Sequence, residues 1–81
     1  MKIRVMFTYT QDLIQEPIIY TLGQMFNLTT NIHSANIAED SGWALVDIEG
    51  NEANIRQGLD WVMSRGLRFE EIPGEDTSEN D

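Results

Sequence analysis

The sequence contains no cysteine among its 81 residues. This absence excludes disulfide bonds, thiolate zinc sites, iron–sulfur clusters bound through cysteine and cysteine nucleophiles. Long apolar runs are also absent, since no stretch approaches the roughly 18 to 20 apolar residues that a membrane-spanning helix needs. The N-terminal segment alternates apolar with polar residues, which is not typical of a signal peptide. We therefore expect a cytoplasmic protein that does not insert into a membrane.

Basic residues are scarce in this sequence. Five lysines and arginines stand against 14 aspartates and glutamates, which gives a formal net charge of −9. Such a charge repels the phosphates of nucleic acids and anionic lipid surfaces. Part of the charge lies at the C-terminus, where residues 75–81 contain no apolar side chain. We expect a folded domain over residues 1–73 and an acidic, disordered tail over residues 74–81.

The apolar residues of the folded part follow the periods of strands and helices in turn. Pro17 suits a helix start, Asn27 and Gly66 suit helix ends, and Asn51 suits an N-cap. The predicted elements are a strand over residues 2–9, a helix over 17–27, strands over 29–37 and 42–49, a helix over 51–66 and a strand over 67–72.

The order β-α-β-β-α-β predicts an α+β, ferredoxin-like fold, in which two helices cover one face of a four-stranded antiparallel sheet. The other face stays open, and strand alternation assigns to it Arg4, Met6, Thr8, Asn31, His33, Ala35, Trp43, Leu45 and Asp47. An apolar patch on an open face usually marks an interface, and a domain this small gains core from a partner. We therefore expect a homodimer, with an interface formed by Met6, Ala35, Trp43 and Leu45.

Residues with catalytic chemistry do not cluster in the sequence. His33 is the only histidine, and no serine, cysteine or set of metal ligands lies at a useful spacing from it. The carboxylates fall mainly in turns and at strand ends, where a solvated surface position is expected rather than an acid–base pair. The glycines form neither a dinucleotide-binding nor a phosphate-binding motif. The sequence thus predicts no enzyme, no metal site and no cofactor.

Residues 41–48 partly resemble the aromatic-rich motif that RNA-recognition domains of this fold carry on their third strand. Ser41 stands where a basic residue is expected, and Leu45 and Ile48 stand where stacking aromatic side chains would be. Because the chain is also strongly acidic, we expect no binding of nucleic acid. Trp43 and Leu45 are instead interpreted as apolar residues of the sheet surface or of an interface.

Several segments, taken in register, resemble the NIL domain family over residues 2–72. They are Pro17–Leu22, Phe26–Ile32, Ser34–Ile37, Gly42–Gly50 and the predicted helix of Asn54–Leu67. The family is named after an Asn-Ile-Leu triplet, which here reads Asn31-Ile32-His33. The resemblance implies a ferredoxin-like, ACT-related fold, in agreement with the order of the predicted elements.

NIL domains are best known at the C-terminus of the ATPase subunits of methionine ABC importers, where paired domains bind methionine and inhibit uptake. The resemblance implies a dimeric regulatory module that binds a small amino acid, with methionine favoured. It places Asn31 in the ligand site, and His33 beside it in the position of the triplet's leucine. The sequence has no phosphate-binding loop, so we expect no ATPase domain in it. Similar domains also occur alone or fused to iron–sulfur segments, and because the sequence has no cysteine we expect a free-standing member. The alternative is a protein-interaction adaptor that docks on a protein partner and binds no small molecule.

Overall fold

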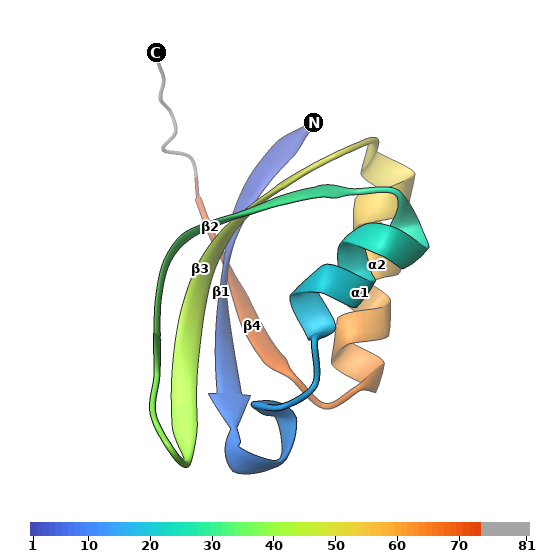
Figure 1. The fold of residues 1–81 in the computed structure, drawn as a ribbon. Coiled ribbons are helices and arrows are strands. Elements are labelled where there is room, and N and C mark those ends of the chain that lie inside the picture. The colour runs from blue at the N-terminus through green and yellow to red at the C-terminus, as the bar shows by residue number, and fades with distance from the viewer. Residues whose placement is uncertain (74–81) are drawn as a thin grey trace.

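The computed structural model describes residues 1–73, and the predicted tail over residues 74–81 lies outside this range. The elements are β1 (Lys2–Thr10), the short 3-10 helix η1 (Gln11–Leu13), α1 (Ile18–Phe26), β2 (Thr29–Ile37), β3 (Ser41–Glu49), α2 (Glu52–Ser64) and β4 (Arg68–Ile72). Figure 1 shows both helices on the same side of the sheet. The predicted ferredoxin-like order and layering are confirmed.

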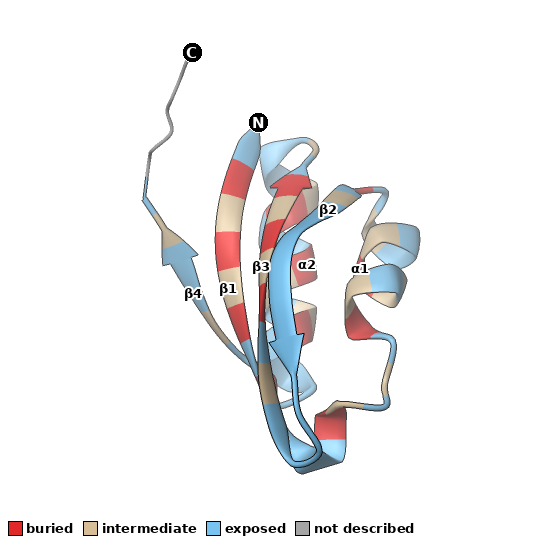
Figure 2. Ribbon diagram, turned by 60° about the vertical axis from the view of Figure 1, so that its left-hand side comes forward, coloured by how far each residue is buried: buried red, intermediate tan, exposed pale blue. Residues whose placement is uncertain are grey.

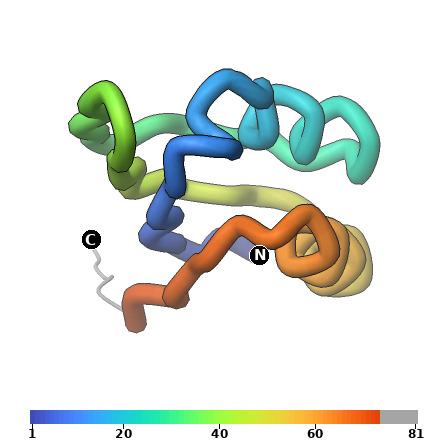
Figure 3. Tube along the Cα trace, turned by 90° about the horizontal axis from the view of Figure 1, so that it is seen from below, coloured from blue at the N-terminus to red at the C-terminus, as the bar shows by residue number. Residues whose placement is uncertain are grey.

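The sheet has the strand order β2-β3-β1-β4, with antiparallel pairing between all neighbours. Figure 3 shows β2 and β4 at opposite edges of the sheet. Alternate residues of the two central strands face the helices and are buried, as the banding of β1 and β3 in Figure 2 shows. The centre of the core consists of Val5 and Phe7 on β1 and Val46 and Ile48 on β3, all fully buried.

The helix ends have local causes in the sequence. The side chain of Asn51 accepts a hydrogen bond from the backbone N–H of Asn54 at 2.7 Å, which caps the start of α2. Gly66 follows α2 with a φ of 86°, a conformation that side-chain-bearing residues rarely adopt. Asn27 ends α1 in the left-handed region, with a φ of 55°. The predicted helix limits are thus confirmed to within about two residues.

Helix α1 packs mainly against α2 and only weakly against β2. The rings of Phe26 and Trp61 lie 6.0 Å apart between the two helices. Gly58 of α2 allows close approach, because a Cβ atom there would lie 2.7 Å from Cδ1 of Leu22. The inner side of the edge strand β2 is therefore left largely uncovered, and every residue of β2 except Thr30 is exposed (Figure 2).

A β-bulge in β2 overturns one of the predicted side-chain positions. The pairing with β3 skips His33 between Ile32 and Ser34. One extra residue in a strand reverses the sides of all residues that follow it. Ala35 consequently pairs with Ala44, which is 2% exposed and faces the helices. The prediction that Ala35 lies on the open face is wrong.

Candidate functional site

The open face of the sheet carries a small apolar patch. Leu45 of β3 pairs with Met6 of β1, and Trp43, two residues before Leu45, lies on the same side of the sheet. Trp43 is 38% exposed, while Met6 and Leu45 are half-buried. We call Met6, Trp43 and Leu45 the open-face patch. The structure brings together these three of the four predicted interface residues, and it places Ala35 on the other side of the sheet.

An ion pair borders the open-face patch. Nε of Arg4 lies 2.7 Å from Oδ1 of Asp47, and Nη2 of Arg4 lies 3.3 Å from Oδ2. This hydrogen bonding lowers the pKa of the Asp47 carboxyl below its usual range, and the charges of Arg4, His33 and Lys2 act in the same direction. Burial acts in the opposite direction. Asp47 is therefore a fixed negative charge beside a fixed positive charge at neutral pH.

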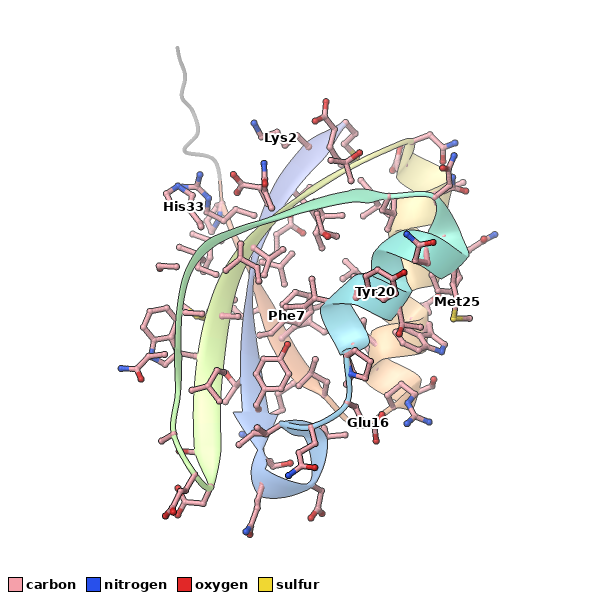
Figure 4. All side chains as sticks on the ribbon, viewed as in Figure 1. Lys2, Phe7, Glu16, Tyr20, Met25 and His33 are labelled. Atoms are coloured by element: carbon pink, nitrogen blue, oxygen red, sulfur yellow. The ribbon has the colours of Figure 1, made fainter. Side chains whose placement is uncertain are left out.

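The predicted ligand residues lie next to this ion pair. Asn31 pairs with Asp47 across the β2–β3 ladder and is exposed. Figure 4 shows the side chain of His33 pointing away from the helices, and its charge acts on the Asp47 carboxyl. Within residues 1–73, neither the Asn31 nor the His33 side chain makes a hydrogen bond. The polar atoms of both side chains are therefore available to a ligand.

The Arg4–Asp47 pair is the part of this site that the sequence did not predict. Strand alternation places both side chains on the open face, but the register between β1 and β3 decides whether they meet. A single sequence contains no direct signal for that register. Only the opposite charges at two open-face positions point to the contact.

The chemistry of this surface suits a small molecule that carries both charges. It combines a guanidinium, a carboxylate and an amide with adjacent apolar side chains. Within residues 1–73 there is no group of three acidic, histidine or cysteine side chains that could hold a metal ion. In the same residues no helix is long and apolar enough to span a membrane.

Comparisons with known proteins show which fold and family this chain shares. The C-terminal domain of an ABC transporter ATP-binding protein from Enterococcus faecalis superposes with a TM-score of 0.78 at 21% sequence identity, covering 90% of this chain and 86% of that one. A de novo designed protein, Ferredog-Diesel, superposes with a TM-score of 0.54 at 15% identity, covering 90% of this chain and 85% of that one. Both likenesses show the ferredoxin-like fold.

No curated protein matches the chain significantly. The NIL domain family matches residues 3–71, which include both helices and all four strands except the first residue of β1 and the last residue of β4. The predicted resemblance is confirmed, and because the match covers nearly the whole described chain, this protein belongs to the NIL domain family.

Proposed function

We propose that this NIL domain is a regulatory module that binds a small amino acid, with methionine favoured, on the open face of a homodimer. The observation that carries the proposal is the Arg4–Asp47 ion pair. It lies next to the open-face patch, and Asn31 lies opposite Asp47 on the neighbouring strand β2. The family resemblance supports the same ligand class, since paired NIL domains of methionine importers bind methionine.

Each group of an amino acid has a matching partner on this surface. Its ammonium can donate to the Asp47 carboxylate, and its own carboxylate is attracted by the positive charge of Arg4. The amide of Asn31 can both donate and accept, so it can bind either end of the ligand. An apolar ligand side chain would then lie beside Leu45 and Met6, at the end of the open-face patch that is next to the ion pair.

A second copy would complete the site. The open-face patch is centred on a tryptophan, a residue type enriched at the centres of interfaces. A two-fold axis near Trp43 would bury the patch against its own copy and bring the two Asn31 side chains to the same seam. A ligand at the seam would touch both subunits, so its binding and the dimer equilibrium would be coupled.

The test of this function is a titration of the protein with the common amino acids. A ligand that binds only the folded state raises the melting temperature, and calorimetry then gives its affinity. We expect Asn31→Ala to weaken binding of the best amino acid by about tenfold, because one or two hydrogen bonds are lost. The matched control is Gln57→Ala, since Gln57 also has an amide side chain but is exposed on α2, on the helix side of the sheet. Equal affinities of wild type and Asn31→Ala would remove Asn31 from the site.

A second candidate function is that of an adaptor that docks on a protein partner. It is favoured by the edge strand β2, which has no lysine or proline to discourage pairing with another chain. Residues 17–38, which include α1 and β2, contain no aspartate, glutamate, lysine or arginine. Depletion of charge is typical of interface cores. Failure of every amino acid to raise the melting temperature would favour this candidate.

A further inference from the structure

An apolar groove lies on the helix side of the sheet, between the segment that leads into α1 and the edge strand β2. Its volume is about 220 Å³. The β2 wall contains Ile32 and Ile37, which remain 60% and 48% exposed although both face the helices. The lining consists of Tyr9, Ile14, residues 16–20, Ile32, Ala35, Ile37 and Ala44. The groove is thus open to solvent along one side of an otherwise covered sheet face.

Three features of the fold create this groove. The bulge at His33 turns Ala35 and Ile37 to the helix side. Ala35 then pairs with Ala44, and two methyl side chains leave space between the strands and the helix layer. Helix α1 does not fill that space, because it packs mainly against α2. The groove follows from the backbone geometry and from two small residues rather than from one displaced side chain.

Tyr9 contributes an unpaired polar group to this groove. Its side chain lines the groove and the residue is only 7% exposed. Its hydroxyl has no hydrogen-bond partner within the part of the chain that the structure describes. Burial raises the pKa of this hydroxyl, so it is a neutral donor at physiological pH. The groove that this side chain lines is open to solvent, so water can bind the hydroxyl, and a ligand atom that accepts its hydrogen bond would replace that water.

Charge and size limit what the groove can hold. Its only charged lining residue is Glu16, whose carboxylate already accepts a hydrogen bond from Arg65. An ionised ligand would therefore find no free counter-charge among the lining residues. An apolar cavity of about 150 Å³ accommodates benzene. A groove of about 220 Å³ therefore suits a compound with somewhat more atoms than benzene.

We propose that this groove is a binding site for a small, uncharged, mainly apolar molecule whose carbonyl or ether oxygen accepts a hydrogen bond from the Tyr9 hydroxyl. The site is independent of the proposed amino-acid site, because Asn31 and the open-face patch lie on the opposite side of the sheet. Failure of one proposal would leave the other unaffected. The two sites are also distinguishable by experiment, since each would shift the amide resonances of different residues.

The probes are acetophenone, which has an acceptor oxygen, and ethylbenzene, which has none. Each is titrated into the ¹⁵N-labelled protein while the amide resonances of Ile19, Ala35 and Ile37 are followed. We expect both compounds to shift these resonances saturably. Tyr9→Phe should weaken acetophenone binding about three- to tenfold, the usual value of one hydrogen bond, and should not weaken ethylbenzene binding. The change in affinity from wild type to Tyr9→Phe is compared between the two compounds. This comparison cancels the difference in hydration between acetophenone and ethylbenzene.

A second pair of variants tests the location. Ala35→Leu should fill the groove and reduce the binding of both probes at least about tenfold, because a leucine side chain occupies the proposed volume. Ala53→Leu is the matched control, since Ala53 is exposed on α2 and does not line the groove. The proposal is overturned if Tyr9→Phe weakens both probes equally, or if Ala35→Leu leaves both affinities unchanged. It is also overturned if the groove resonances change with protein concentration alone, since a second copy would then occupy the groove.

Discussion

The Arg4–Asp47 ion pair makes the free energy of unfolding depend on pH. The folded pKa of Asp47 is below its ordinary value of 3.8. The pair therefore stabilises the fold fully at pH values above 3.8, and the stabilisation is lost as the pH falls through the lower, folded pKa. The pair is only partly shielded, with side chains 35% and 18% exposed, so its effect is modest.

Asp47→Asn tests this dependence. We expect the variant to be less stable than wild type by about 1 kcal/mol at neutral pH, because the amide cannot replace the charge. The difference should disappear in strong acid, where the wild-type carboxyl is also neutral. Urea unfolding measured over a pH series gives both values. Asp60→Asn is the control, since Asp60 is exposed and has no ion pair among residues 1–73. A difference that persists in acid would show that the ion pair is not its cause.

At the scale of elements, β2 differs from the other strands because it contains one residue more than its pairing requires. Deleting His33 should leave β2 regular, since Ile32 and Ser34 already have the sides that a continuous strand would give them. We expect the deletion variant to fold, with a change in stability within about 1 kcal/mol. Thermal unfolding followed by circular dichroism measures this change.

Deleting Thr8 provides the contrast. Thr8 is also exposed, but β1 pairs with β3 without a bulge. Its loss should turn Tyr9, which is 7% exposed, away from the helices and cost more than about 2 kcal/mol. If the two deletions had equal effects, the bulge would not be the reason for the tolerance of β2.

The sequence predicted the elements well because the signals for them are local. Asn27, Asn51 and Gly66 mark helix ends through their own backbone or side-chain chemistry, and alternation identified the buried faces of β1 and β3. The sequence could not predict on which face of the sheet the residues of β2 after His33 lie, because a bulge depends on the pairing with β3. The register of Arg4 with Asp47 could not be predicted for the same reason.

The groove could not be predicted either. Alternation placed Tyr9 on the buried face, which is correct, since the residue is 7% exposed. Whether its hydroxyl finds a partner depends on the segment before α1 and on β2, which are far from β1 in sequence. Side-chain periodicity indicates which residues are buried, but it does not show whether space remains between them.

At the scale of the whole molecule, the net charge of −9 opposes association of two copies. The repulsion acts over long range and is screened by salt, whereas burial of the open-face patch is not. We therefore expect the proposed dimer to tighten several-fold when the ionic strength rises from about 0.05 M to about 0.5 M. Sedimentation at each salt concentration measures the dissociation constant. A dimer that weakens with salt would be held by charge pairs instead of the patch.

Trp43→Glu is the direct test of the proposed dimer. A tryptophan at an interface centre commonly contributes about 2 kcal/mol or more. The glutamates of two copies would also repel each other across the two-fold axis. We therefore expect the dissociation constant to rise at least about thirtyfold, which leaves a folded monomer. Amino-acid binding should be lost with the dimer, because both Asn31 side chains would contribute to one site. Light scattering, circular dichroism and calorimetry on one sample measure the three properties.

The control for Trp43→Glu is Met63→Glu, which introduces the same charge at another exposed apolar residue. Met63 is 62% exposed on α2, on the side of the molecule opposite the open-face patch. We expect this variant to remain dimeric and to bind the ligand, because the added charge lies outside the interface. If Trp43→Glu also remained dimeric, the interface would lie elsewhere, and the uncharged surface of α1 and β2 would be the next place to test. A wild-type monomer with full ligand affinity would show that a single open face is a complete site.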